Sequence, residues 1–196
     1  MKETVGIVLA GGLSRRFGSP KAFAKLGNEY FYKIAVEAMS ASCDEIVIVT
    51  LPELMERFGN GENLMTDKVE YAGLGPLAGI LSAMESVEAN RYVVLPCDMP
   101  FIDDKAISKL ITLHNESVTA VISNGRYHPL VSIWDAQMKS AVKEALENNQ
   151  LSVMKLLSIS NTAWVQGSVL TDDETRMFTN VNTPETLERG CQNGNS

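Results

Sequence analysis

The sequence is poor in the side chains that most often bind transition metals, with three cysteines and two histidines among 196 residues. Cys43, Cys97 and Cys191 lack the paired spacing of a metal-binding motif, and an odd number of cysteines cannot all form internal disulfides. Reduced thiols in a cytoplasmic protein are therefore expected. The sequence predicts neither a disulfide-stabilised secreted domain nor a cysteine–histidine metal site.

A long apolar run is also missing, because none approaches the roughly 18 residues that a membrane-spanning helix needs. The short apolar run near the N-terminus follows Glu3 and precedes Arg15 and Arg16, where a signal peptide would have its cleavage region. With 45% hydrophobic and 21% charged residues, the composition is typical of one globular domain. We expect no association with a membrane.

Positive charge is scarce as well, since the net charge is −7, and this argues against a general nucleic-acid binder. The positive charge that is present is concentrated near the start of the chain. Residues 1–33 hold six of the 17 Lys and Arg residues but two of the 24 acidic residues. Most of these cations lie in or beside the stretch VGIVLAGGLSRRFGSPKAFAK, residues 5–25. This distribution indicates a local anion-binding site in an acidic protein.

The stretch 5–25 matches neither the P-loop pattern nor the G-x-G-x-x-G pattern of common phosphate-binding loops. Gly11 and Gly12 nevertheless allow a close backbone approach, so that their N–H groups can point at phosphate oxygens. Arg15, Arg16 and Lys21 could neutralise the negative charge of such a ligand. A phosphate site is the functional interpretation, and a solvated basic loop is the alternative.

Short β-branched runs alternate with stretches of helical periodicity along the chain. The runs predict strands at 5–9, 45–50, 91–96 and 118–123, with a further strand at 127–134 that could be antiparallel. Helical periodicity covers 31–39, 76–87, 103–113 and the segment from Thr183, which is suited to cap the last helix. This order predicts an α/β fold of three layers, with a mostly parallel sheet and a Rossmann-like N-terminal half.

Ligands bind beyond the carboxyl ends of the strands in sheets of this kind, so polar and glycine-rich segments are expected there. LPCDMP at 95–100 follows the strand at 91–96, GLGPLAG at 73–79 leads into the helix at 76–87, and TNVNTP at 179–184 leads into the last helix. Asp98 is suited to hold Mg²⁺ against phosphate oxygens, with helix capping as its alternative role. Asn180 and Asn182 could contact a ligand or add a metal ligand, and turn formation is their alternative. His128 is interpreted as structural or substrate-facing, and His114 as a favourable charge at a helix end.

The motifs LAGGLSRRFGSPK, GPLAG, PCDMP and NVNTPETL together resemble the molybdenum cofactor guanylyltransferase family in their order and spacing. The resemblance covers nearly the whole chain. Phe17 stands where the family usually has methionine, and this swap should alter packing more than chemistry. Val49 stands where some members carry an asparagine after the second strand, so the contact that this asparagine would make with the base does not carry over to this chain.

The resemblance implies a single nucleotidyltransferase domain over 1–196, similar in fold to nucleotide-diphospho-sugar transferases. The nucleotide-binding half would cover about 1–115 and the acceptor-binding half about 116–190. The implied reaction links GMP from GTP to the terminal phosphate of Mo-molybdopterin and releases pyrophosphate, with Mg²⁺ as cofactor. Other enzymes of the molybdenum cofactor are implied as protein partners.

Site residues follow from the resemblance position by position. Arg16, Lys21 and Asp98 would be catalytic, and Asp98 and Asn182 would bind the metal. The residues that would contact the substrates are Leu9, Ala10, Gly11, Gly12, Lys21, Asp67, Gly75, Pro76, Leu77, Asp98, Asn180 and Asn182. A phosphate monoester is largely ionised at neutral pH, so the attacking acceptor needs no general base. This agrees with the missing catalytic triad.

Three other functions are compatible with the motifs. A cytidylyltransferase for the same cofactor, or a sugar-phosphate nucleotidyltransferase, would keep the fold and the chemistry but change the substrate. By resemblance, LAGG and GPLAG favour the guanylyl members. A non-catalytic GTP-binding or cofactor-carrier protein is the third possibility, and the presence of both Lys21 and Asp98 argues against it.

Overall fold

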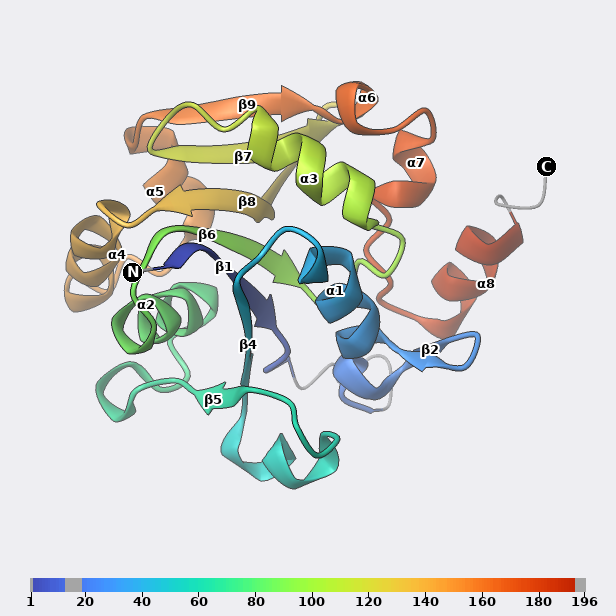
Figure 1. Ribbon diagram of the computed structural model, residues 1–196, viewed down its shortest axis with the longest axis horizontal. Coiled ribbons are helices and arrows are strands. Elements are labelled where there is room, and N and C mark those ends of the chain that lie inside the picture. Colours follow the sequence, from blue (N-terminus) through green and yellow to red (C-terminus); the bar gives the residue numbers. More distant parts are fainter. Residues whose placement is uncertain (1, 13–18, 193–196) are drawn as a thin grey trace.

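The computed structural model describes residues 2–12 and 19–192 of the chain (Figure 1). Its centre is a seven-stranded sheet with the strand order β5-β4-β1-β6-β8-β7-β9. The strands are β1 (Lys2–Leu9), β4 (Glu45–Thr50), β5 (Leu64–Thr66), β6 (Ala89–Pro96), β7 (Val118–Ser123), β8 (Arg126–Asp135) and β9 (Thr162–Gln166). A small second sheet pairs β2 (Lys25–Leu26) with β3 (Glu29–Tyr30).

The sheet is mostly parallel, as the alternation of strands and helices predicts. Strand β1 runs parallel to both β4 and β6, and β4 runs parallel to β5. Strand β8 is antiparallel to both of its neighbours, β6 and β7, whereas β7 and β9 are parallel. The further strand predicted at 127–134 is therefore present, and its antiparallel direction places the start of β8 beside the carboxyl end of β6.

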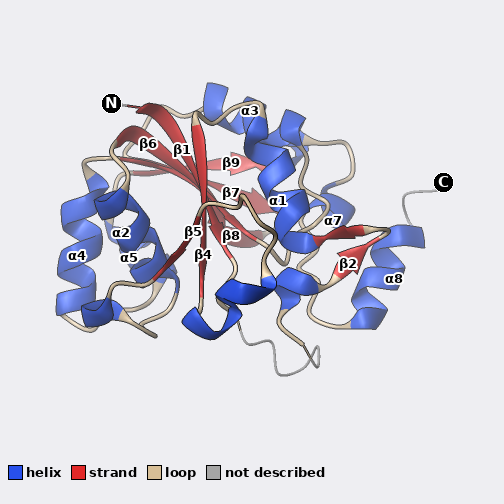
Figure 2. Ribbon diagram, turned by 60° about the horizontal axis from the view of Figure 1, so that its bottom comes forward, coloured by secondary structure: helices blue, strands red, loops and turns tan. Residues whose placement is uncertain are grey.

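Helices cover both faces of the sheet and complete the three-layer α/β fold (Figure 2). The helices are α1 (Phe31–Ser40), α2 (Pro76–Ser86), α3 (Asp104–Thr112), α4 (Met138–Glu147), α5 (Val153–Ile159), α6 (Gly167–Leu170), α7 (Glu174–Met177) and α8 (Pro184–Gln192). Short 3-10 helices lie at η1 (Lys21–Phe23), η2 (Pro52–Arg57) and η3 (Val69–Tyr71). Alternation of side chains along β1 builds the two cores: Ile7 packs with α2, α4 and α5, and Val8 packs with α1 and α3. The predicted fold class is confirmed.

Local sequence signals account for the helix starts. Asp103 caps α3, since its side chain accepts a hydrogen bond from the Ala106 N–H at 2.9 Å. Pro76 is the first residue of α2, where a missing N–H costs nothing. Thr183 precedes α8, and its hydroxyl accepts from the Thr186 N–H at 3.3 Å. Within the described residues, no helix is both long and apolar enough to cross a bilayer.

His114 follows the end of α3, and its ring is bonded to two side chains. Its ring is buried and its two nitrogens lie 2.8 Å from the Thr119 hydroxyl and 3.0 Å from an Asp135 carboxylate oxygen. The ring therefore connects the end of α3 to β7 and β8. The sequence interpretation missed this role because Asp135 lies 21 residues away along the chain.

Candidate active site

A cavity of about 510 Å³ opens at the carboxyl ends of β1, β4 and β6. This is where ligands bind in doubly wound sheets. The substrate-site residues of the sequence prediction that line it are Leu9, Gly11, Gly12, Lys21, Asp67, Gly75, Pro76, Asp98 and Asn180. The cavity is thus built from segments that are far apart in the sequence.

Three of the predicted residues lie elsewhere, and one cannot be placed. The side chains of Ala10 and Leu77 are buried in the two cores, with 1% and 0% of their surface exposed, so they do not line the cavity. The Ala10 N–H is already bonded to the carbonyl of Val49 at 2.8 Å. Asn182 is exposed and does not line the cavity, but its side chain accepts a hydrogen bond from Lys21, which does. Arg16 lies outside the described residues.

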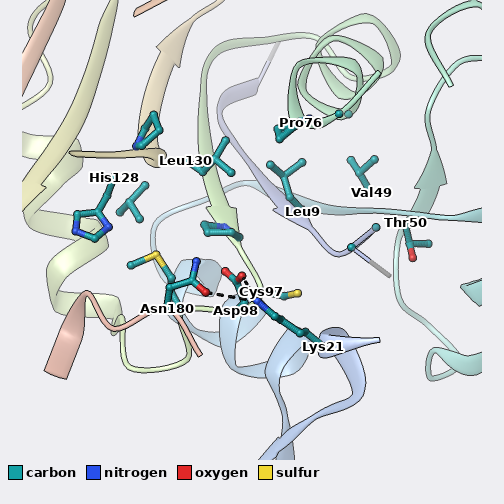
Figure 3. A pocket seen from close by; sticks show the side chains of 18 of the residues that line it. Leu9, Lys21, Val49, Thr50, Pro76, Cys97, Asp98, His128, Leu130 and Asn180 are labelled. Atoms are coloured by element: carbon teal, nitrogen blue, oxygen red, sulfur yellow. Dashed lines mark hydrogen bonds and ion pairs between the residues drawn. The ribbon is translucent and has the colours of Figure 1, made fainter. Parts of the chain in front are cut away.

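The cavity has two walls, with Lys21 and Asp98 between them (Figure 3). One wall, here called the β1–β4 wall, is formed by Leu9, Val49, Thr50, Asp67, Gly75, Pro76 and Gly79. The other, here called the β8 wall, is formed by Arg126, Tyr127, His128, Pro129, Leu130 and Val131, with Asn180 at its edge. Two walls around one charged centre suit a reaction that joins two substrates.

Glycines shape the β1–β4 wall. A methyl group at Gly79 would lie 3.1 Å from side-chain atoms of both Leu9 and Val49, so a larger residue would push these side chains away from α2. Gly75 precedes α2 with φ 84° and ψ −162°, a region that only glycine occupies readily. These two positions set the N-terminus of α2 at the cavity edge and leave a slot lined by apolar side chains.

Asp67 is the acidic group of the β1–β4 wall. It follows β5, is partly buried, and accepts a hydrogen bond from the Gly73 N–H at 3.3 Å. Burial raises the pKa of this carboxyl above its ordinary value, and the Gly73 hydrogen bond opposes the shift only in part. The wall therefore holds a carboxylate whose negative charge is poorly solvated in the free protein.

Replacing Asp67 with asparagine is expected to increase the free energy of unfolding at pH 7. A carboxyl whose pKa is raised by folding binds protons more tightly in the folded state, so stability is lost as pH rises from its ordinary pKa of 3.8 through the folded value. Asparagine keeps the acceptor for Gly73 and removes the charge. Urea denaturation from pH 7 down to pH 4 should show the advantage of the variant shrinking as the pH falls. A variant less stable than the parent at pH 7 would contradict this account.

Lys21 is the centre of the cluster between the walls. Its Nζ donates to Asp98 Oδ2 at 2.8 Å, to Asn182 Oδ1 at 2.5 Å and, at the limit of hydrogen bonding, to Asn180 Oδ1 at 3.5 Å. Only 12% of the Lys21 side chain and 20% of the Asp98 side chain are exposed. The Val181 N–H donates to the Asp98 carbonyl at 2.8 Å, and this bond brings both asparagines to the lysine.

Asp98 retains an unused oxygen. Within the described part of the chain, its Oδ1 is buried and has no hydrogen-bond partner. A buried acceptor of this kind calls for a ligand that supplies positive charge or a donor. The same part of the chain has no group of three or more His, Cys, Asp or Glu residues that could bind a metal ion alone. Asp98 with an amide oxygen therefore suits Mg²⁺, which binds one or two protein oxygens together with substrate phosphates.

Most of the lining residues outside the predicted set belong to the β8 wall or to the quoted motifs, and those that belong to neither are Val49, Thr50 and Leu51. Thr50 is the last residue of the predicted strand at 45–50 and Leu51 follows it, so only the rule that ligands bind at strand ends could have singled them out. Cys97, within the motif LPCDMP, is buried, with 7% of its surface exposed. Burial, with the neighbouring Asp98 charge, raises the pKa of its thiol to about 12, so it is no nucleophile at neutral pH.

The β8 wall is formed by the first residues of β8. Its side chains combine the exposed Arg126, the half-exposed Tyr127 and the largely buried His128. Burial, together with the positive charge of Arg126, lowers the pKa of His128 below its ordinary value, so the imidazole is neutral at pH 7. Apart from His128, no sequence motif identifies this wall.

Comparison with known proteins agrees with the geometry. The model of a family described as the MobA-like NTP transferase domain matches residues 6–162. A probable molybdenum cofactor guanylyltransferase of Geobacillus sp. (strain WCH70) is 39% identical over 192 residues, covering 96% of this chain and 98% of the relative. A probable molybdenum cofactor guanylyltransferase of Bacillus licheniformis is 36% identical over 193 residues, covering 96% of each.

Two solved structures show the same fold. Molybdopterin-guanine dinucleotide biosynthesis protein A from Archaeoglobus fulgidus superposes with a TM-score of 0.80 at 22% identity, over 97% of this chain and 98% of that one. A putative glucose-1-phosphate thymidylyltransferase from Bacillus anthracis superposes with a TM-score of 0.72 at 18% identity, over 95% and 93%. At these identities the likeness concerns the fold alone.

Proposed function

The chain is a nucleotidyltransferase of the MobA-like NTP transferase family, and from this premise we propose that it transfers GMP from GTP to the terminal phosphate of Mo-molybdopterin. The products are the guanine dinucleotide form of the cofactor and pyrophosphate. The observation that carries the proposal is the Lys21–Asp98–Asn182 cluster between two walls of one cavity. Each wall offers space for one of the two substrates.

The β1–β4 wall is proposed to bind GTP. Its apolar slot between Leu9, Val49 and Gly79 suits a flat base, and the backbone at Gly11 and Gly12 suits the phosphates. Asp67 would accept hydrogen bonds from the nucleoside, which would offset the poor solvation of its charge. The names of the curated relatives favour guanine over cytosine, and sugar phosphates are not favoured as the acceptor.

Lys21, with Arg16, is proposed to bind the triphosphate. A lysine that already lies among three oxygens can exchange them for phosphate oxygens when the nucleotide enters. Asp98 and Asn182 would then hold Mg²⁺, and the unused Asp98 Oδ1 is the observation that fits this cation. Bound Mg²⁺ would neutralise negative charge on the phosphates during transfer.

No residue is needed to deprotonate the acceptor. Its phosphate is already ionised at neutral pH, and Cys97 and His128 are both neutral there. The protein's contribution is to hold two anions in line and to stabilise the charge that develops at the α-phosphate. The acceptor would lie on the β8 wall. The proposal thus divides the single domain into a nucleotide half, about 1–115, and an acceptor half, about 116–190.

Calorimetric titration with GTP, CTP, ATP and UTP, with and without Mg²⁺, is the first test. We expect GTP to bind at least about tenfold more tightly than the other nucleotides, a difference of about 1.4 kcal/mol. A transfer assay with α-labelled GTP and Mo-molybdopterin should then place the label in the dinucleotide and release unlabelled pyrophosphate. Preference for CTP would assign the chain to the cytidylyl branch, and binding without transfer would favour a carrier protein.

A further inference from the structure

The side chains of both histidines in the sequence are largely buried, but they differ in their hydrogen bonds. His114 is fixed at both ring nitrogens by Thr119 and Asp135. His128 is 7% exposed, yet within the described residues neither of its ring nitrogens has a hydrogen-bond partner. A buried polar side chain without partners requires an explanation.

The nitrogens of His128 are not sealed inside the protein. The fully buried atoms without a hydrogen-bond partner in the described part of the chain are those of Thr50 and Asp98, so His128 can still be reached from the cavity that it lines. Its ring lies 5.3 Å from the ring of Phe178, centre to centre. Phe178 belongs to the segment that also carries Asn180 to Lys21. His128 is thus held in place by packing while its hydrogen-bonding groups stay available to a ligand.

The position of His128 points to the acceptor and not to the nucleotide. Figure 3 shows it across the cavity from Leu9, Val49 and Pro76, with Asn180 between it and Lys21. A group in this position lies on the wall opposite the one proposed for the nucleotide (Figure 3). It therefore faces the part of the acceptor that does not react.

The chemistry of the β8 wall suits an uncharged heterocycle. A neutral imidazole offers one donor and one acceptor, which complements the amide and amino groups of a pterin ring better than it does a phosphate. Leu130 and Val131 supply an apolar surface beside it. Tyr127 is half exposed and packs edge-on against Trp164, with the ring centres 4.7 Å apart, so a further flat surface borders the site.

We propose that His128 is a specificity-determining residue that binds the acceptor by hydrogen bonding the pterin portion of Mo-molybdopterin. This rests on the proposed function, and it names the residue through which the acceptor half of the site recognises its substrate. In this arrangement Lys21 and Asp98 bind the phosphates, while His128 hydrogen bonds to the pterin ring.

Two variants separate hydrogen bonding from packing. His128→Phe keeps a ring against Phe178 but removes both nitrogens, whereas His128→Gln keeps a donor and an acceptor. We expect His128→Phe to raise the KM for Mo-molybdopterin about tenfold, the loss of one good hydrogen bond of about 1.4 kcal/mol, and His128→Gln to stay within about threefold. The KM for GTP should change less than about twofold in both variants. Equal losses in the two variants, or a rise confined to the KM for GTP, would overturn the proposal.

Proton NMR gives a readout that does not depend on turnover. The untagged protein has two histidines, so two Hε1 resonances are expected, and His128→Gln assigns them. Addition of molybdopterin should shift the resonance of His128 and leave that of His114 unchanged, while GTP with Mg²⁺ should leave both in place. A His128 resonance unmoved by saturating molybdopterin would also overturn the proposal.

The same experiments distinguish failure of this inference from failure of the proposed function. If the wild-type protein transfers no GMP but its His128 resonance responds to molybdopterin, the reaction is wrong and the recognition residue is right. If the wild-type protein transfers GMP and His128→Phe retains an unchanged KM for the acceptor, the reaction is right and the role of His128 is wrong.

Discussion

Lys21→Ala is expected to lower kcat/KM for GMP transfer by about 100- to 1,000-fold, because one preorganised charged donor is worth about 3–4 kcal/mol in the transition state. Most of the Lys21 side chain is buried, and its Nζ lies where Asp98 and Asn182 converge. No other lysine or arginine among the described residues bonds to this pair, so none there can substitute for it. Steady-state kinetics with GTP as the varied substrate measures the loss.

A second measurement, on the variant Lys21→Met, tests the position of Lys21 independently of turnover. In the free protein its Nζ bonds to both residues proposed to hold the metal, through Asp98 Oδ2 and Asn182 Oδ1. Lys21→Met should therefore bind Mn²⁺ more tightly than the wild type when no nucleotide is present, as followed by electron paramagnetic resonance. Lys143→Ala, an exposed lysine on α4, is the matched control and should behave as wild type in both assays. Turnover near that of the wild type in Lys21→Ala would show that Lys21 has no catalytic role.

Asp98→Asn is expected to reduce GMP transfer by about 100-fold or more and to abolish tight Mn²⁺ binding in the presence of GTP, since it removes the carboxylate proposed to hold the cation. The amide can still accept the hydrogen bond from Lys21 at the Oδ2 position. The effect should therefore fall on metal binding and catalysis, and not on the position of the lysine.

Stability separates this outcome from simple misfolding. Asp98→Asn loses the ion pair with the largely buried Lys21 and leaves an amide group without a partner at the position of the buried Oδ1, so some loss of stability is expected. The variant should still unfold in one cooperative thermal transition, and its near-UV circular dichroism spectrum should match that of the wild type. Asp104→Asn, at an exposed position in the first turn of α3, serves as a matched control. An Asp98→Asn protein that retains Mg²⁺-dependent transfer would exclude Asp98 as the metal ligand.

The sequence by itself determined the elements that are specified locally. Runs of β-branched residues gave β1, β4, β6 and β7, because a strand buried on both faces needs an uninterrupted apolar stretch. Pro76 marked the start of α2, and Asp103 or Asp104 that of α3, because capping depends on residues within one helical turn; the structure assigns the cap of α3 to Asp103. Lys21 and Asp98 were identified because each follows a strand, and the carboxyl ends of parallel strands meet at one edge of the sheet.

Tertiary structure decided how these parts meet. The 2.5 Å contact between Lys21 and Asn182 joins residues 161 positions apart, and no local pattern encodes it. Ala10 and Leu77 lie within two of the motifs, but their side chains point into the cores and not into the cavity. The direction of a side chain depends on how its helix or strand packs against the rest of the fold. The antiparallel direction of β8, set by its pairing with β6 and β7, brought His128 to the cavity and created the second wall. Such pairings are fixed by long-range burial and hydrogen bonding, which the order of residues alone does not reveal.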